Sequence, residues 1–263
     1  MFVGGPTEGR PGMTRLAFAD EGVGDPLVLI HAGIADARMW QPQVDRFAGA
    51  WRMVRPDLRG FGRTAHSEGD YRHAGDLVEL FDDLALPPAV VVGASMGGRV
   101  AIDFALERPD LVRGLVLVGS TYDGFHFLDE ELFDQWRVLT DTYEAGRLDE
   151  AAALETDIWL GMNASPEVKH AVVEMVRLSY DHGEIEETEI DSPASQRLGE
   201  LKMPTLLLLG EVDRIDIARA SDELINSIPH ARLVTMPGAA HLPNLEQPDV
   251  FNTILADFLA QLH

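Results

Sequence analysis

A serine enclosed by small residues is the first feature of this sequence that points to chemistry. Residues 93–97 read Gly-Ala-Ser-Met-Gly; they follow an unbroken apolar run at 89–92 and precede a stretch with helical periodicity. In that context a Gly-x-Ser-x-Gly pattern is typical of a sharp strand-to-helix turn that exposes the serine hydroxyl and tolerates only small neighbours. We therefore predict that Ser95 is a nucleophile. The alternative is a tight turn that merely contains a serine.

A serine nucleophile needs a base, and the base needs a group that orients it. Of the nine histidines, His241 is the candidate because it lies in a small-residue loop, Gly-Ala-Ala-His-Leu-Pro, just after the last predicted strand. Asp213 follows the preceding predicted strand, and functional groups of parallel sheets converge at such carboxyl strand ends. The chain order Ser, Asp, His also fits this arrangement. The alternatives for the acid are Glu211, Asp216 and the more distant Asp123.

The elements that must position these residues alternate along the chain. Short apolar runs predict strands at 27–30, 51–55, 89–92, 115–118, 205–209 and 231–235. Longer stretches predict helices at 74–84, 96–107, 218–227 and from 248 to the C-terminus. Strand and helix in alternation imply right-handed crossovers. The predicted fold class is therefore α/β, with a mostly parallel, doubly wound sheet covered by helices on both faces.

The alternation stops between residues 121 and 199, where apolar residues recur at helical spacing. One of these helices is expected to begin at Ser165-Pro166, with the serine as N-cap and proline in the first turn. We interpret 121–199 as a helical lid inserted into a core formed by 13–120 and 200–263. Residues 1–12, rich in Gly and Pro, are expected to be a loose N-terminal leader.

An oxyanion formed at Ser95 would need backbone N–H donors. Met96 follows the nucleophile at a helix N-terminus, whose dipole favours negative charge. Gly33, in the loop after the 27–30 strand, is the predicted second donor, with Ile34 as the fallback. Substrate contacts are expected from Ile34, Trp136, Trp159 and Leu242. Other apolar residues that could line a pocket beneath the lid, or simply form the core of the lid, are Phe125, Phe127, Met162 and Met175.

Several segments together resemble a known family. They are Leu-Ile-His-Ala-Gly at 29–33, Arg-Pro-Asp-Leu-Arg-Gly-Phe-Gly-Arg at 55–63, the Ser95 turn, Gly-Glu-Val-Asp at 210–213, and Ala-His at 240–241. With this set the chain resembles the α/β-hydrolase superfamily, in its lidded esterase, enol-lactonase and haloperoxidase-like branch. The resemblance covers nearly everything after Met13. Two departures are Ala32, where the family usually has glycine, and the absence of a proline after Asp213 that many relatives carry.

The predicted function is hydrolysis of a carboxylic ester or lactone by Ser-His-Asp acyl transfer, on a small-molecule substrate with a neutral, small to medium apolar acyl group. Haloalkane dehalogenases and epoxide hydrolases, which resemble this fold, carry a carboxylate where this chain has Ser95, so these two activities are not expected. Carbon–carbon bond hydrolases usually have Gly-Pro-Gly after the first strand, which is absent here. The alternatives are a cofactor-free perhydrolase or haloperoxidase-like enzyme, and a ligand receptor built on a hydrolase fold.

The strongly negative charge bears on which partners and substrates the protein could bind. The net charge of −23 argues against nucleic acid, because phosphate binding is driven by Lys and Arg. Residues 121–200 hold 20 Asp and Glu against 5 Lys and Arg. This segment is either an ordinary solvated surface or a field that disfavours anionic substrates.

No metal or organic cofactor is implied, since the sequence has no cysteine, HExxH pair or Gly-rich phosphate loop. The sequence contains no run of about 20 apolar residues, the length that a membrane-spanning helix needs. Residues 1–12 lack the features of a secretory signal. We expect a cytoplasmic protein; nothing in the sequence sets its oligomeric state.

Overall fold

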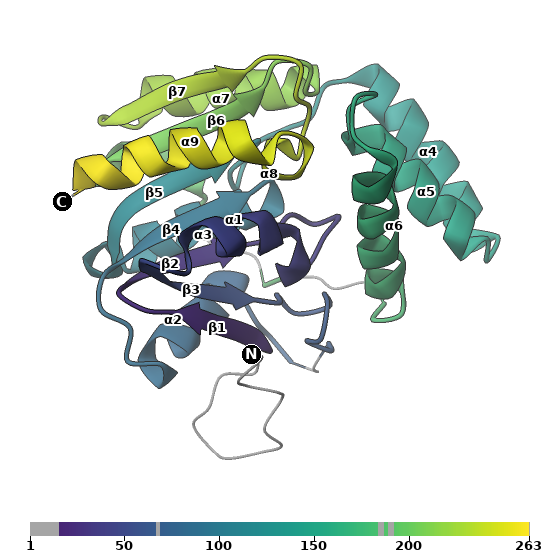
Figure 1. Ribbon diagram of the computed structural model, residues 1–263. Coiled ribbons are helices and arrows are strands. Elements are labelled where there is room, and N and C mark those ends of the chain that lie inside the picture. The colour runs from purple at the N-terminus through teal and green to yellow at the C-terminus, as the bar shows by residue number, and fades with distance from the viewer. Residues whose placement is uncertain (1–15, 67–68, 184–186, 189–191, 263) are drawn as a thin grey trace.

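The computed structural model of the protein describes residues 16–66, 69–183, 187–188 and 192–262. The predicted leader, 1–12, lies outside these residues. Within them the chain forms a seven-stranded sheet in the order β1-β3-β2-β4-β5-β6-β7 (Figure 1). The strands are β1 (Phe18–Gly22), β2 (Asp25–Ile30), β3 (Trp51–Pro56), β4 (Ala89–Ala94), β5 (Val112–Val118), β6 (Thr205–Gly210) and β7 (Ala231–Met236).

All six predicted strands are confirmed, and they pair in parallel. The central strands are apolar along their whole length because both of their faces are covered. β1 was not predicted. It is an antiparallel edge strand, paired with β3 from Phe18 opposite Pro56 to Gly22 opposite Arg52. The α/β class and the mostly parallel sheet are as expected.

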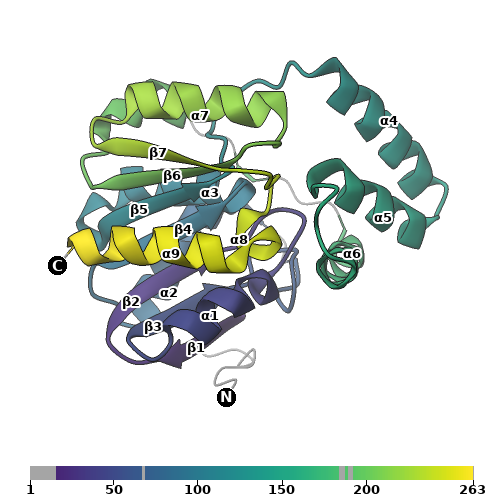
Figure 2. The ribbon, with the colours of Figure 1, turned by 45° about the horizontal axis from the view of Figure 1, so that its top comes forward.

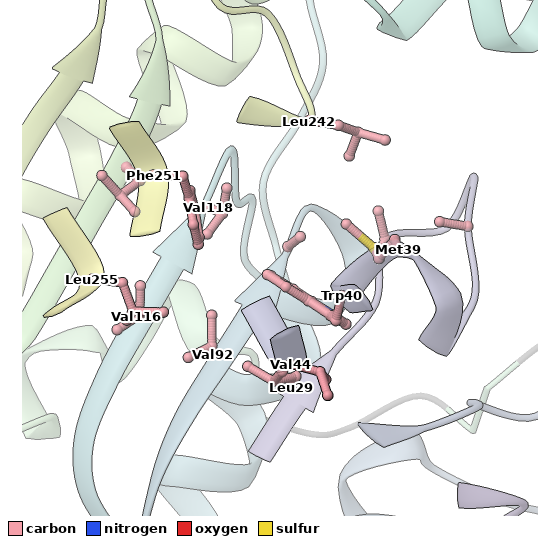
Figure 3. Close-up of a cluster of buried hydrophobic side chains, with 14 of the residues drawn as sticks. Leu29, Met39, Trp40, Val44, Val92, Val116, Val118, Leu242, Phe251 and Leu255 are labelled. Carbon is pink, nitrogen blue, oxygen red and sulfur yellow. The ribbon is translucent and has the colours of Figure 1, made fainter. Parts of the chain in front are cut away.

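Helices cover both faces of the sheet (Figures 1 and 2). One face packs against α1 (Gln41–Phe47) and α9 (Pro248–Leu259), and the other against α2 (His73–Asp83), α3 (Met96–Glu107) and α7 (Ile215–Ser227). Successive residues of β2 point to opposite faces. Leu29 belongs to the same buried cluster as Trp40 and Phe251, which Figure 3 shows, whereas Ile30 belongs to the cluster of the α2 and α3 side chains. Short helices complete the core: α8 (Pro243–Glu246), η1 (Ala37–Trp40), η2 (Pro109–Leu111), η3 (Ala194–Gln196), η4 (Leu198–Glu200) and η5 (Ala260–Leu262).

Between β5 and β6 the chain forms α4 (Glu130–Glu144), α5 (Leu148–Trp159) and α6 (Pro166–Tyr180). These three helices stand apart from the helical layers that cover the sheet (Figures 1 and 2). The helical insertion predicted from the apolar spacing is therefore present, and its role as a lid stays a prediction. The Ser165 hydroxyl accepts a hydrogen bond from the Val168 N–H at 3.3 Å, which confirms the predicted N-cap. No helix in the described part of the chain is long and apolar enough to span a membrane.

Candidate active site

Ser95 occupies the turn between β4 and α3 in an unfavourable backbone conformation, with φ 52° and ψ −117°. Its N–H donates to the Val118 carbonyl at 2.8 Å, which ties the turn to β5. The glycines around it are required by packing. A Cβ on Gly97 would lie 2.3 Å from the His31 carbonyl oxygen, and one on Gly93 would lie 2.2 Å from that of Gly97. The small residues predicted around the nucleophile therefore have a steric cause.

The structure brings Ser95, His241 and Asp213 together. His241 Nε2 lies 2.8 Å from Ser95 Oγ, and its Nδ1 lies 3.0 Å from each carboxylate oxygen of Asp213. The side chains of His241 and Asp213 are each only 1% exposed, so water hardly competes for these hydrogen bonds. A buried carboxylate on Nδ1 favours the tautomer whose Nε2 can accept the serine proton.

The competing acids are engaged elsewhere. The Glu211 carboxylate accepts the Gly238 N–H at 2.9 Å. Asp216 accepts the N–H groups of Leu128 and Asp129 and pairs with Arg219. These amide and guanidinium donors hold the pKa of Asp216 below its ordinary value despite burial. Asp123 lines a pocket beside Ser95 and has no hydrogen bond to His241.

Two loops shape the surroundings of Asp213. Asp213 follows β6, and its Oδ1 accepts the N–H of Arg214 at 2.7 Å. Gly119, at the end of β5 with φ 51°, faces the pair: a Cβ there would lie 3.1 Å from His241 Nδ1 and 3.2 Å from Asp213 Oδ2. A side chain here would therefore press against both the histidine and the aspartate.

Glu246 braces the loop that carries His241. Its carboxylate accepts the N–H of Ala240 at 3.0 Å and that of Leu242 at 3.1 Å, on either side of the histidine. Burial raises the pKa of Glu246, although both amides favour its charged form. The Trp159 ring packs on the imidazole with centroids 4.4 Å apart. His241 is therefore held through both its neighbouring backbone and its ring.

The two predicted oxyanion donors lie side by side. Met96 is the first residue of α3, and a Cβ on Gly33 would lie 3.6 Å from the Cβ and Sδ atoms of Met96. The Gly33 loop is held by His31, whose Nε2 accepts the Leu58 N–H at 2.9 Å and whose Nδ1 contacts the Ala32 carbonyl at 2.8 Å. Burial lowers the pKa of His31, consistent with a neutral structural histidine. The donor role of Gly33 and Met96 stays a prediction.

Two pockets lie near Ser95 and share Met96 and Arg99 in their linings. The first, here called the Ser95 pocket, has a volume of about 330 Å³ and is lined by Ser95, Phe125, Phe127, Trp159 and Ile217 among others. The second, here called the inner pocket, has a volume of about 590 Å³ and lies between the core and α4–α6. Its lining includes Gly33, Tyr71, Tyr143, Glu155, Tyr180 and Glu187.

Of the four residues predicted to contact substrate, one lines either of these two pockets. Trp159 lines the Ser95 pocket. Trp136 lines neither pocket; its ring packs behind, with centroids 6.4 Å from Trp159 and 5.4 Å from Phe127. Ile34 and Leu242 are buried in the hydrophobic core, where Figure 3 shows Leu242, and line neither pocket.

Two methionines suggested for the pocket also lie elsewhere. Met162 is 98% exposed, and Met175 is buried in the hydrophobic core.

Three charged residues that line the inner pocket were not predicted from the sequence: Arg99, Glu155 and Glu187. Arg99 follows Ser95 by four positions, so one helical turn of α3 places it beside Ser95, and that spacing could have revealed it. Glu155 and Glu187 come from the inserted segment, and only packing brings them to the pocket. In the described part of the chain, no group of three or more His, Asp or Glu could hold a metal ion.

Comparison with known proteins places this geometry in context. A family model described as alpha/beta hydrolase fold matches residues 25–248. The chain is 29% identical to BpoC of Mycobacterium tuberculosis, whose name assigns it provisionally to the non-heme bromoperoxidases, over 95% of this chain and 99% of that protein. It is 27% identical to a pimeloyl-[acyl-carrier protein] methyl ester esterase of Yersinia enterocolitica, over 91% and 95%. A thermophilic esterase from Thermogutta terrifontis superposes with TM-score 0.76 at 28% identity, covering 94% of each chain.

Proposed function

The chain belongs to the alpha/beta hydrolase fold family and is an enzyme of that family, and from this premise we propose that it hydrolyses a carboxylic ester or lactone by acyl transfer through Ser95, His241 and Asp213. The observation that carries the proposal is the continuous line of hydrogen bonds from Asp213 through His241 to Ser95 Oγ. This line of hydrogen bonds ends at Ser95, whose strained backbone conformation is the one that presents a nucleophilic hydroxyl in such turns.

The first half of the reaction acylates the serine. Ser95 Oγ attacks the substrate carbonyl carbon while His241 Nε2 takes the hydroxyl proton, and Asp213 stabilises the imidazolium that forms. The carbonyl oxygen becomes an oxyanion, which receives hydrogen bonds from the N–H groups of Met96 and Gly33. One such donor is typically worth about 3 kcal/mol in the transition state. The tetrahedral intermediate collapses, and His241 gives its proton to the departing alcohol oxygen.

The second half releases the acid. A water molecule loses a proton to His241 Nε2 as its oxygen attacks the acyl carbon. The tetrahedral intermediate then expels Ser95 Oγ, which regains the proton. The brace from Glu246 and the ring of Trp159 keep His241 in one orientation for both halves, so the same nitrogen can act as base and acid in turn.

We assign the two parts of the substrate to the two pockets that meet at Met96. The Ser95 pocket has aromatic walls, Phe125, Phe127 and Trp159, and suits an apolar group of small to medium size. The inner pocket would take the other part of the substrate. Both pockets use residues of the inserted segment, so α4–α6 would act as the lid that the sequence predicts.

The test is hydrolysis of a panel of p-nitrophenyl esters and small lactones by the wild type and by Ser95→Ala. We expect turnover by the wild type and a loss of about 10⁴-fold or more in the variant, because the oxyanion donors alone leave little rate. Ser227→Ala is the matched control, since Ser227 is exposed at the end of α7. Equal activity of Ser95→Ala and Ser227→Ala would refute the assignment.

A second candidate, a cofactor-free perhydrolase with haloperoxidase-like side activity, is favoured by the likeness to BpoC. It would use the same acyl-serine, with hydrogen peroxide replacing water as the second nucleophile, so that a peracid leaves instead of an acid. Bromination of a dye in acetate, peroxide and bromide would measure it, because the released peracid oxidises bromide to the brominating hypobromous acid and returns to acetic acid. A rate comparable to ester hydrolysis would favour this candidate, and a rate far below it would leave hydrolysis as the main reaction.

A further inference from the structure

The inner pocket contains more polar and aromatic groups than an acyl chain needs. Its walls include the rings of Phe61, Tyr71, Tyr143 and Tyr180. Tyr143 and Tyr180 meet edge to face, with centroids 4.9 Å apart and planes at 74°. Aromatic faces attract cations through the ring quadrupole. The pocket therefore suits a ligand with a positive charge.

Glu155 supplies a negative charge that the protein does not balance. It lines the inner pocket, and its carboxylate accepts a hydrogen bond from the Tyr180 hydroxyl at 2.5 Å. No Lys, Arg or His among the described residues forms an ion pair with it. Burial raises the pKa of Glu155, and the Tyr180 hydroxyl only partly opposes this. A partly buried carboxylate without a cation is the expected partner of a cationic ligand.

Among the described residues, the one cation in the pocket lining is already compensated. Arg99 donates a hydrogen bond to Glu187, and its Nη1 lies 3.7 Å from Asp103 Oδ2. His73 also lines the pocket, and burial lowers its pKa to about 4, so it is neutral at physiological pH. The lining thus holds two carboxylates against one guanidinium, and the uncompensated charge is that of Glu155.

Two buried polar atoms in the same wall lack a partner. Tyr71 and His73 are each more than nine-tenths buried, and neither the Tyr71 hydroxyl nor His73 Nδ1 has a hydrogen-bond partner within the described ranges. Buried polar atoms are normally paired. The hydroxyl oxygen and a deprotonated Nδ1 are both acceptors, as is the carboxylate of Glu155. A protonated amine could donate to acceptors of this kind, and the carboxylate of Glu155 favours it over a neutral donor.

We infer that the inner pocket binds a protonated amine carried by the substrate, held by Glu155 and by the rings of Tyr143 and Tyr180. This inference rests on the proposed hydrolysis, because it names the substrate class of that same site. The excess of acidic residues in 121–200 acts in the same direction, since it raises the concentration of cations near the pocket. The enzyme is then selective for aminoalkyl or aminoacyl esters.

The test compares each cationic ester with a neutral isostere in which CH replaces the N–H⁺ group. One pair is 2-(dimethylamino)ethyl butyrate and 3-methylbutyl butyrate; the other is methyl 4-(dimethylamino)butyrate and methyl 5-methylhexanoate. The pairs place the charge on the alcohol or on the acyl side. We expect kcat/KM, measured by pH-stat titration, to favour the amine about tenfold or more in at least one pair. High salt should reduce the preference.

Glu155→Gln should bring the ratio of kcat/KM within that pair close to one. The matched control is Glu174→Gln on α6, which removes the same charge from a side chain that is 58% exposed and outside the pocket lining, and it should keep the ratio. The wild-type ratio tests the inference even if Glu155→Gln fails to fold. Hydrolysis of the neutral esters without preference for either amine would overturn this inference alone. Absence of all hydrolysis would overturn the proposed function with it.

Discussion

Adding one methyl group at Gly119 should disturb the contact between His241 and Asp213 and so test their proposed catalytic role. Gly119 has φ 51°, and a Cβ there would lie 3.1 Å from His241 Nδ1, 3.2 Å from Asp213 Oδ2 and 3.3 Å from His241 Cε1. Ordinary contacts of a methyl carbon are about 3.5–4.0 Å. In Gly119→Ala the histidine or the aspartate must therefore retreat by a few tenths of an ångström, which stretches the 3.0 Å hydrogen bonds between them.

Two costs follow, and a second glycine separates them. The left-handed conformation costs an alanine about 1–2 kcal/mol of folding stability wherever it occurs. A hydrogen bond to a charged group contributes about 1.5–3 kcal/mol in all, so its loss would lower kcat by at most roughly 10- to 100-fold. Gly146, between α4 and α5, has φ 72°, and a Cβ there would meet nothing within 4 Å among the described residues beyond its chain neighbours. Gly146→Ala therefore carries the first cost without the second.

The assay is kcat and KM for a p-nitrophenyl ester, together with thermal unfolding, for the wild type and both variants. We expect both variants to lose stability, Gly119→Ala the more because it also strains the contact between His241 and Asp213, and only Gly119→Ala to lose kcat by about 10- to 100-fold. Wild-type kcat in Gly119→Ala would refute the view that the pair works at this close approach. An equal loss of kcat in Gly146→Ala would show that backbone strain alone explains the effect.

Two further predictions concern buried carboxylates. Glu246→Gln leaves one of the backbone amides of Ala240 and Leu242 facing an NH₂ group. We expect the variant to lose about 1–3 kcal/mol of folding stability and to have a lower kcat with little change in KM. Unchanged kcat and melting temperature would contradict the view that Glu246 holds the loop of His241. Burial raises the pKa of Asp103 to about 7. The folded state therefore holds this proton to higher pH than the unfolded state, and stability is lost as pH rises from about 4 to 7, by on the order of 4 kcal/mol. Asp103→Asn should accordingly unfold at a higher temperature than the wild type at pH 8, with the difference shrinking by pH 4; a difference independent of pH would contradict the assignment.

Much of the fold could be predicted because its strands are locally distinctive. The runs at 89–92 and 205–209 are apolar throughout, as central parallel strands are, and they lie inside β4 and β6. β1 was missed because its sequence, Phe-Ala-Asp-Glu-Gly, contains residues that are rare in strands. It becomes a strand only through its pairing with β3 at the edge of the sheet. Such a tertiary cause leaves no local signal.

The candidate site divides in the same way. Ser95, Asp213 and His241 each follow a recognisable strand, so the topology alone brings them to one rim of the sheet. The pocket walls instead depend on how α4–α6 pack on the core. Ile34 and Trp136 have suitable side chains, yet packing turns them away from the two pockets. Glu155 looks like an ordinary surface residue of an amphipathic helix until its neighbours are placed.

The most direct test of the central claim is to locate the covalent adduct of a fluorophosphonate by peptide mass spectrometry and to measure its rate of formation. We predict a single adduct on Ser95, none in Ser95→Ala, and formation slowed by about 10³-fold or more in His241→Ala, because the imidazole activates the hydroxyl. An adduct on another residue, or an undiminished rate without the imidazole, would contradict the account.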